Sequence, residues 1–271
     1  MNVKHRRRAG AESSLLAVLL AVMIAGSAAG ASAESCTLAA VHAGMTVPVQ
    51  HLRGDWSCRL AYVIDQPTTT NSVGPLRAAM DRVMYLHLLD RPPLAAALIN
   101  RLDLADYKAE TRGSGRWWGS DGEGSEGIVE LVHAESTTRI YYLEGTHRSR
   151  FLPNVSGKAV VFLRMNAVTD SNGLPAVEST LVAYARLDNR ILSGLASVLR
   201  PLIGSTVSRK LAKGVDVVNR LGLAMRQRPD RVLFEATDPP PLPDEDVAYL
   251  KEALGARAPA ATTGRVEGAR P

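Results

Sequence analysis

Apolar residues recur at a helical spacing in the first third of the chain, then alternate, and then return to a helical spacing. A period of about 3.6 residues predicts two short helices over residues 75–90 and 92–102, each opened by a proline. Between residues 107 and 187 the period falls to about 2, and short polar turns separate the runs. This pattern predicts an antiparallel meander of at least five strands.

The two most regular strands, residues 158–168 and 177–187, follow each other through a hairpin turn at 169–173. Their odd-numbered residues are the more apolar set, which predicts that one face of the sheet is covered. The same parity, continued into the earlier strands, adds to that face Val129, Leu131, Tyr141, Leu143 and His147.

A long amphipathic helix follows the sheet, with its apolar residues in a single stripe over 202–225. Pro201 predicts a kink or a break before this stripe, and Pro229 predicts its end. The proline-rich segment 238–243 predicts an extended arm, and residues 244–254 predict a last short helix.

Two short helices, an antiparallel meander and a long C-terminal helix are the element order of the helix-grip fold. On that order, and on the stretches 85–92, 127–133 and 202–225 that carry it, residues 74–228 resemble the START-like (SRPBCC) superfamily. The resemblance implies an α+β domain whose antiparallel sheet curves around the C-terminal helix. It also implies an apolar cavity for a lipid, sterol, polyketide or other hydrophobic molecule, although some relatives are enzymes.

We expect the cavity walls to come from the covered sheet face and from the stripe of the last helix. The residues predicted to contact a ligand are Leu131, His133, Tyr141, Leu143, His147, Leu163, Met165, Leu181, Ala183, Leu211, Val215 and Val218. His133 and His147 are interpreted either as a polar or acid–base pair in the cavity, or as structural histidines. The acid–base interpretation gives an alternative function, a cyclase- or hydrolase-type enzyme using the same cavity. A further alternative is an interaction module whose helix and sheet close a filled core.

The first 33 residues have the regions of a secretory signal peptide. A basic head precedes an apolar run at 15–25, and Ala31 and Ala33 occupy the positions of a cleavage site before Glu34. Cleavage predicts a periplasmic or secreted protein; an uncleaved membrane anchor is the alternative. The predicted organisation is signal peptide 1–33, N-terminal extension 34–73, START-like domain 74–228, proline-rich arm and short helix 229–255, and disordered tail 256–271.

The two cysteines, Cys36 and Cys58, both lie in the exported part. An oxidising compartment favours a disulfide between them, and free thiols are the alternative. Export also removes four of the 32 basic residues and one of the 27 acidic residues, so the net charge falls from +5 to +2. A charge this small argues against nucleic acid as a partner.

The sequence offers no complete catalytic or metal-binding motif. An acidic loop with Asp121, Glu123 and Glu126 lacks the last ligand of an EF-hand, which would stand at Val132, so we interpret it as a hairpin turn. The histidines lack the spacing of a metal site, and neither a serine nucleophile elbow nor a dinucleotide fingerprint is present. We therefore predict no catalytic residues, no metal and no cofactor.

Two further features concern the partners of the protein. Trp117 and Trp118 are interpreted as sheet packing, with contact to a membrane surface or a cavity mouth as the alternative. Arg148 and Arg150 either bind a lipid phosphate or carboxylate or form a solvated strand end. The leading hypothesis is an exported protein that binds a lipid or other hydrophobic small molecule and contacts membranes at most transiently. Ligand identity, protein partners, oligomeric state and the role of the N-terminal extension are left open by the sequence.

Overall fold

A computed structural model describes residues 36–42, 44–52, 54–148, 154–188 and 196–255. The chain divides into two units after Cys36, and every described helix and strand lies in the second unit. The predicted signal peptide and the predicted disordered tail lie outside the described residues.

The second unit is built around a seven-stranded antiparallel sheet with the order β3-β9-β8-β7-β6-β5-β4. Its strands are β3 (Thr69–Ala78), β4 (Lys108–Gly113), β5 (Arg116–Ser120), β6 (Ser125–Ala134), β7 (Thr138–His147), β8 (Val155–Thr169) and β9 (Pro175–Leu187). From β4 to β9 each strand pairs with the next one along the chain, which is the predicted meander. A small two-stranded sheet, β1 (Val41–His42) with β2 (Met45–Thr46), and a 3-10 turn at Val49–His51 precede it.

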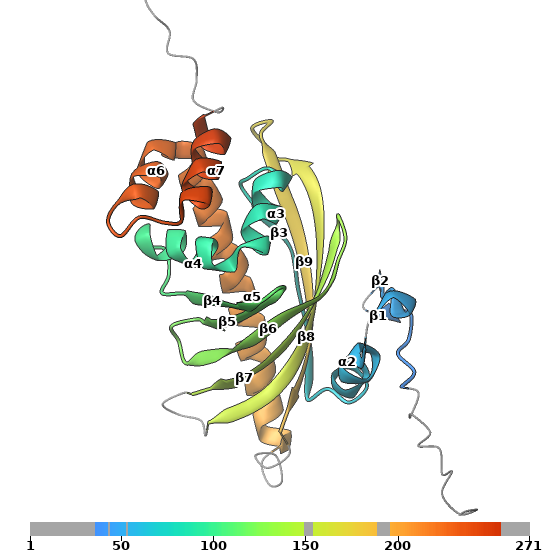
Figure 1. The fold of residues 1–271 in the computed structure, drawn as a ribbon. Helices are drawn as coiled ribbons and strands as arrows, with labels where there is room; N and C mark the ends of the chain where they lie inside the picture. Colours follow the sequence, from blue (N-terminus) through green and yellow to red (C-terminus); the bar gives the residue numbers. More distant parts are fainter. Residues whose placement is uncertain (1–35, 43, 53, 149–153, 189–195, 256–271) are drawn as a thin grey trace, which may run out of the picture. The chain divides into compact units, whose positions relative to one another are not determined.

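Helices lie on both sides of this sheet. The α-helices among the described residues are α2 (Trp56–Ile64), α3 (Arg82–Asp90), α4 (Pro92–Arg101), α5 (Ala196–Gln227), α6 (Pro229–Thr237) and α7 (Asp244–Gly255). Figure 1 shows α5 running along one face of the sheet, with α3 and α4 near one end of that helix and α2 on the opposite face. The fold is α+β and of the helix-grip type, as the element order predicts.

The first predicted helix begins later than expected, because residues 69–78 form the edge strand β3. Asp81 caps α3 by accepting a hydrogen bond from the Met84 amide at 2.9 Å. The strand is rich in threonine, asparagine and serine, and its polar side chains hide the alternation that marks the other strands. One of these polar side chains contacts helix α5: the Asn71 amide donates to the Gly204 carbonyl at 2.9 Å and to the Ser208 hydroxyl at 2.8 Å. The strand therefore crosses the boundary predicted at residue 74 and ties the sheet edge to α5.

Two features of the C-terminal helices also differ from the expectations. Helix α5 runs through Pro201, which lies inside it, so the predicted break at this residue is absent. Helix α6 was not predicted, since Val232 and Ala236 are its only buried residues and give no periodic signal.

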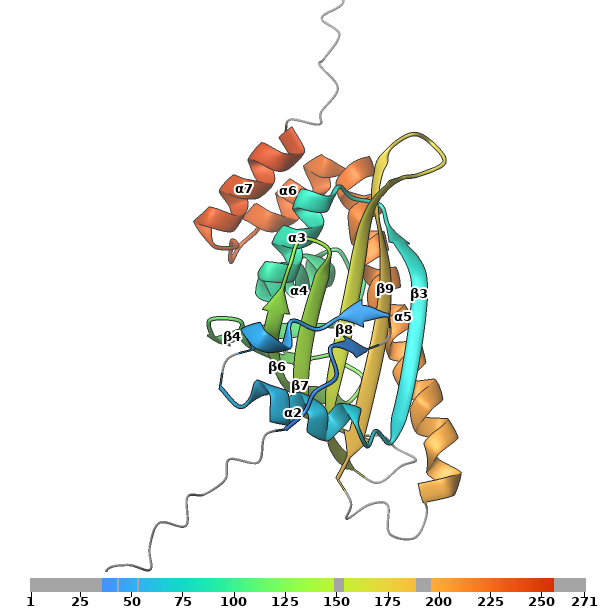
Figure 2. The same cartoon turned by 90° about the vertical axis from the view of Figure 1, so that its right-hand side faces the viewer.

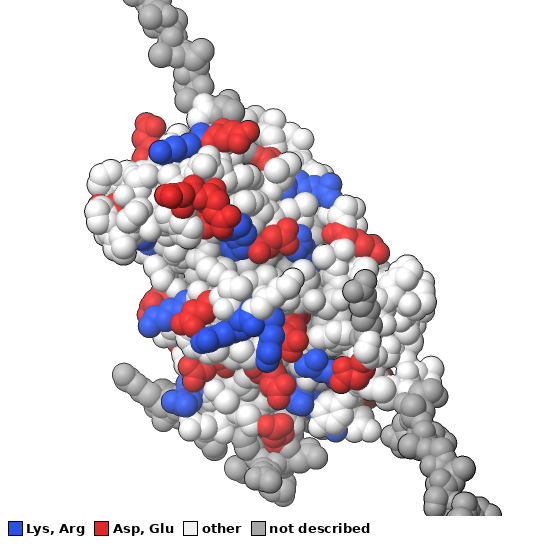
Figure 3. Space-filling model, viewed as in Figure 1, with Lys and Arg blue, Asp and Glu red and all other residues white. Residues whose placement is uncertain are grey.

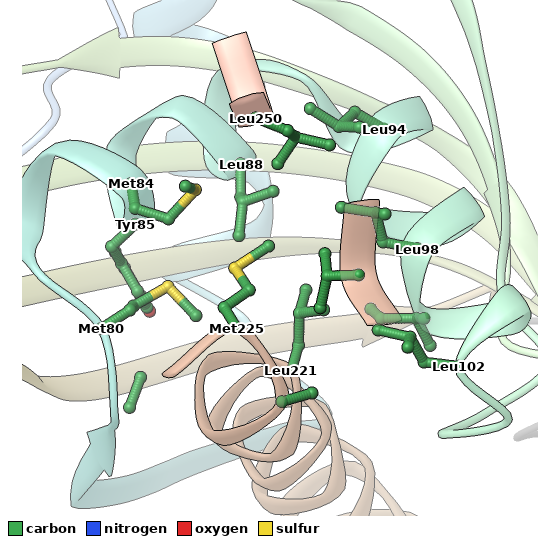
Figure 4. Close-up of a cluster of buried hydrophobic side chains, with 14 of the residues drawn as sticks. Met80, Met84, Tyr85, Leu88, Leu94, Leu98, Leu102, Leu221, Met225 and Leu250 are labelled. Atoms are coloured by element: carbon green, nitrogen blue, oxygen red, sulfur yellow. The ribbon is translucent and has the colours of Figure 1, made fainter. Parts of the chain in front are cut away.

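The core lies where α3, α4, α6 and α7 meet the C-terminal half of α5 (Figure 4). Leu221 and Met225 of α5 are buried there between the methionines and leucines of the other helices. Gly222 permits this contact, because a Cβ at that position would lie 2.9 Å from the backbone of Ala79. The Asn219 side chain accepts a hydrogen bond from the Ala79 amide at 3.1 Å and fixes the same approach.

The opposite face of the sheet is also covered, which corrects the prediction of a single covered face. A second cluster joins the even-numbered residues of the central strands to α2 and the residues before it, namely Ile140, Tyr142, Val160, Phe162 and Val182 with Leu38, Met45, Val47, Leu60 and Val63. The parity of the sequence indicated that this face was the less apolar one, because Lys158, Arg164 and Asn166 share it near the ends of β8. The described residues of the N-terminal extension from Thr37 onward are therefore part of the same folded unit as the sheet (Figure 2).

A disulfide bond joins Cys36 to Cys58, as predicted. Cys58 lies in α2, the helix that covers the second face of the sheet. The bond thus links this helix covalently to the start of the described chain.

Candidate binding cavity

The space between the inner face of the sheet and α5 is not filled by side chains. A cavity of about 710 Å³ lies there, and α3 and α4 contribute to its wall. The residues at its surface are predominantly apolar, and they come from β4 to β9 as well as from the three helices. A volume of this size lies within the range of about 300–1,000 Å³ that is typical of small-molecule sites.

Helix α5 presents one face to this cavity. Leu211, Gly214, Val215 and Val218 follow one another at the spacing that places residues on one side of a helix, and all four line the cavity. A Cβ built on Gly214 would meet no atom within 4 Å. The glycine therefore leaves open the volume that a larger side chain would occupy.

A row of glycines crosses the sheet at one level of the cavity. Gly119 pairs with Gly127, Gly127 with Gly145, and Gly145 with Gly157, so four neighbouring strands have a glycine in register. A Cβ on Gly127 would lie 2.4 Å from the Glu144 carbonyl oxygen, and one on Gly145 would lie 2.4 Å from that of Glu126. Because no other residue tolerates these approaches, the row permits the close approach and bending of strands that surround the cavity.

The inner end of the cavity, beside α3, carries a small group of buried polar residues. Arg139 and Tyr141 share the inner face of β7, since they pair with Leu163 and Val161 of β8. Arg139 is 5% exposed, and its guanidinium donates from both terminal nitrogens to the Asp90 carboxylate, Nη2 to Oδ2 at 3.1 Å. Burial raises the pKa of Tyr141 to about 12, although the neighbouring Arg139 acts in the opposite direction.

The part of the cavity at the other end of β7, here called its mouth, is more polar. Ser125 Oγ lies 3.0 Å from His147 Nδ1, and both residues line the cavity. Burial lowers the pKa of His147, and the positive charge of Lys210 lowers it further. The histidine is therefore neutral near pH 7 and has one ring nitrogen free to accept a proton.

The acidic loop before β6 is joined to α5 by ion pairs. Asp121 forms an ion pair with Lys210, and Glu123 forms one with Lys213. Burial alone would raise the pKa of Asp121, but hydrogen bonds from Lys210 and from backbone amides outweigh it and lower the pKa. A hydrogen bond from Lys213 lowers the pKa of Glu123. The loop is a hairpin turn, as interpreted from the sequence, and its carboxylates attach the mouth of the cavity to the helix.

Eight of the residues predicted to contact a ligand line the cavity: Tyr141, Leu143, His147, Leu163, Leu181, Leu211, Val215 and Val218. Met165 lies instead in the packed core with Leu221 and Met225. Ala183 is buried on the inner face of β9 and Leu131 pairs with Tyr141, but neither lines the cavity.

His133 lies on the opposite face of the sheet. A β-bulge shifts the register between Leu131 and His133, so that His133 pairs with Ile140, a residue of the outer cluster. Its Nε2 lies 3.0 Å from Glu135 Oε1. His133 and His147 therefore do not meet, and of the two interpretations the pair in the cavity is wrong, because one inserted residue reverses the side to which a strand residue points.

Several cavity residues were missed by the sequence reasoning. Tyr85, Leu88 and Leu89 of α3 and Ile99 of α4 line the wall, although their spacing indicated only core packing. The glycine row was also missed. Its signal is present in the sequence, as a glycine in each of four successive strands, and becomes visible once the strands are aligned in register.

The sequence allowed two interpretations for Trp117 and Trp118, sheet packing or contact with a membrane or cavity mouth. It also allowed two for Arg148 and Arg150, binding of an anionic lipid group or a solvated strand end. Trp117 is buried, 8% exposed, and both tryptophans line the cavity. Arg148 is exposed and lies 3.7 Å from Glu126, whereas Arg150 lies outside the described residues. On the face shown in Figure 3, basic and acidic side chains are interspersed.

Within the described part of the chain, no group of three or more His, Cys, Asp or Glu side chains is arranged to hold a metal ion. No helix in these same segments has the length and apolar character needed to cross a membrane.

Comparison with protein-family models gives no match, and comparison with curated protein sequences gives none either. Solved structures with a similar fold include truncated norcoclaurine synthase from Thalictrum flavum, which is 16% identical with a TM-score of 0.38 over 57% of this chain and 94% of that chain. A conserved protein from Geobacillus kaustophilus is 10% identical with a TM-score of 0.38 over 57% and 95% of the two chains. Similarity at this level assigns neither a family nor an activity to the chain.

Proposed function

We propose that the protein binds a lipid or other hydrophobic small molecule in the cavity between the sheet and α5. The single observation that carries this proposal is the cavity itself, about 710 Å³ of unfilled space with a predominantly apolar wall. In a protein without a ligand, larger side chains in this space would increase stability, because the atoms that line an empty volume lack packing contacts on one side.

Binding would be driven by the burial of apolar surface, at about 25 cal/mol per Å² removed from water. Lost translational freedom offsets part of this gain. The few polar groups at the inner end and at the mouth would fix the orientation of the ligand. The cavity has polar groups at two separated sites, so it suits a molecule with distinct ends.

We further propose that the protein acts outside the cytoplasm. The disulfide between Cys36 and Cys58 supports this location, because structural disulfides persist in oxidising compartments. The sequence of residues 1–33 supports it independently, with cleavage before Glu34. Transient contact with a membrane would allow an apolar ligand to enter and leave.

Native mass spectrometry of the protein, purified from the exported fraction without detergent, tests the proposed function. We expect a second mass that exceeds the chain mass by that of one apolar molecule and disappears on denaturation. A single mass equal to that of the chain, together with no uptake of an added apolar probe, would contradict the proposal.

A second candidate function is hydrolysis of an apolar ester in the same cavity. The observation in its favour is the pair formed by Ser125 and His147 at 3.0 Å, with a histidine that is neutral near pH 7. His147 would take the proton of the attacking hydroxyl or water, and would return it to the leaving alcohol. Hydrolysis of p-nitrophenyl octanoate by the wild-type protein, lost in His147→Gln, would support this function. Equal rates for the two proteins would contradict it.

A further inference from the structure

The inner end of the cavity contains a hydroxyl group that the protein itself does not use. Tyr141 lines the cavity, and its buried hydroxyl group forms no hydrogen bond of good geometry within the described residues. The guanidinium of Arg139 interacts with the phenolic oxygen, but it can only donate, so the phenolic hydrogen has no acceptor there. Buried polar atoms in folded proteins are almost always hydrogen-bonded, so an unpaired one requires an explanation.

A second tyrosine in the same cavity shows the contrast. The Tyr85 hydroxyl lies 2.9 Å from Ser179 Oγ and is therefore satisfied by the protein. Tyr85 and Tyr141 both line the cavity near α3, and of these two the hydroxyl group of Tyr141 is the one available to another molecule.

The unpaired hydroxyl acts as a hydrogen-bond donor. Burial raises the pKa of Tyr141 to about 12, so the phenol keeps its proton at physiological pH. The nearest cation is Arg139, which has three donor nitrogens and no acceptor to offer. A group that pairs with Tyr141 must therefore bring an oxygen or another acceptor atom.

The charges around this hydroxyl are balanced. The groups that face it are Arg139, Asp90 and the neutral Tyr85, and the first two form an ion pair through both terminal nitrogens of the guanidinium. Leu163 and Leu181 complete the wall on the adjoining strands. Arg139 Nε is a second buried donor without a partner, so it too would accept only an acceptor atom beside it. Because Asp90 already neutralises the guanidinium charge, a carboxylate would add a buried charge with no free counter-charge, which is unfavourable.

From this arrangement we infer that the ligand carries an uncharged acceptor oxygen, such as a ketone or ester carbonyl, at the end it inserts toward α3, and that Tyr141 donates a hydrogen bond to it. This inference rests on the proposed function, since it assigns the ligand class of the same cavity.

Displacement of the apolar fluorophore N-phenyl-1-naphthylamine tests the inference. The competitors are 2-undecanone, dodecane and undecanoate, which share an alkyl chain and differ in the terminal group. Each is titrated against the wild-type protein, Tyr141→Phe and the matched control Tyr85→Phe. We expect Tyr141→Phe to weaken binding of the ketone by about 3- to 10-fold, the range of a single neutral hydrogen bond. It should leave the affinity for dodecane unchanged, and Tyr85→Phe should preserve the ratio of the two affinities.

The other results are equally decisive. Equal affinities for the ketone in wild type and Tyr141→Phe, or an equal loss for ketone and dodecane, would overturn the inference while leaving the proposed function intact. Preference for undecanoate that depends on Tyr141 would overturn the choice of an uncharged ligand. A Tyr141→Phe variant that does not fold would show that the hydroxyl is structural, and would overturn the inference. If wild type binds neither the fluorophore nor any competitor, the proposed function itself fails.

Discussion

Single residues decide whether the polar groups of the inner cavity belong to the fold or to a ligand. Tyr85 and Tyr141 differ in this respect although both are largely buried tyrosines of one cavity. The Tyr85 hydroxyl is bonded to Ser179, which is 1% exposed, whereas the Tyr141 hydroxyl forms no hydrogen bond of good geometry among the described residues and has no acceptor for its proton.

This difference predicts opposite effects on the stability of the ligand-free protein. Tyr85→Phe should lower the free energy of unfolding by about 1–3 kcal/mol, because it leaves the buried Ser179 hydroxyl unpaired. Tyr141→Phe should change it by less than about 0.5 kcal/mol, since no bond is lost. Urea denaturation of both variants measures the contrast, and an equal loss in the two would show that Tyr141 is also bonded within the protein.

His147 predicts how stability depends on pH. Its pKa is lowered by burial and by Lys210, so the unfolded chain binds more protons than the folded chain just below pH 6.5, the ordinary histidine pKa. Stability should therefore fall as the pH decreases through this range. His87, whose pKa burial also lowers, acts in the same direction.

Replacing His147 with the uncharged Gln should make the unfolding midpoint less sensitive to pH between about 7.5 and 5.5. His51→Gln, at an exposed position, serves as the control and should retain the wild-type dependence. Thermal unfolding across the pH range provides the measurement. A wild-type slope in His147→Gln would show that this histidine is not desolvated in the folded protein.

At the scale of elements, the strands were predicted better than the way they bend. Odd-numbered apolar residues such as Ala159, Leu163 and Leu181 mark one face of β8 and β9. Their parity correctly predicted which residues share that face, and the hairpin turn predicted that the two strands pair. The bulge after Leu131 leaves no trace in the hydrophobic pattern, and for that reason His133 was assigned to the wrong face. Strand β3 was missed because its polar side chains give no alternating hydrophobic pattern. Asn71 forms hydrogen bonds with α5, and this role can be recognised only in the tertiary structure.

The glycine row gives a prediction about the bending of the sheet. Gly145→Ala places a Cβ 2.4 Å from the Glu126 carbonyl oxygen, so the strands must separate. We expect a loss of about 1–3 kcal/mol or more in unfolding free energy, as in other overpacked sites. Gly214→Ala in α5 is the control, since its Cβ meets no atom within 4 Å and alanine favours helix by up to about 1 kcal/mol. Chemical denaturation should give unfolding free energies that decrease from Gly214→Ala to wild type to Gly145→Ala. A Gly145→Ala variant as stable as wild type would contradict the role of the glycine row in the close approach of the strands.

At the scale of the whole molecule, one sheet serves two different purposes on its two faces. The outer face is closed by α2 and the residues around it, which the disulfide links to Cys36. The inner face is packed against helices at one end and left open at the other. The order of helices and strands made this fold predictable from the sequence. The covered outer face was not predicted, because the elements between residues 41 and 51 that help to cover it are too short to show a period.

The central claim is that the space beside α5 is a binding site and not an imperfection of packing. Gly214→Trp tests it most directly, because the indole enters a volume in which a Cβ meets no atom within 4 Å. The measurement is fluorescence titration with N-phenyl-1-naphthylamine, made on wild type, Gly214→Ala and Gly214→Trp at equal fractions of folded protein. The account predicts saturable binding by wild type and Gly214→Ala, and at least about a 10-fold loss, about 1.4 kcal/mol, in a Gly214→Trp variant that remains folded. Wild-type affinity in folded Gly214→Trp would contradict the claim that the ligand occupies this cavity.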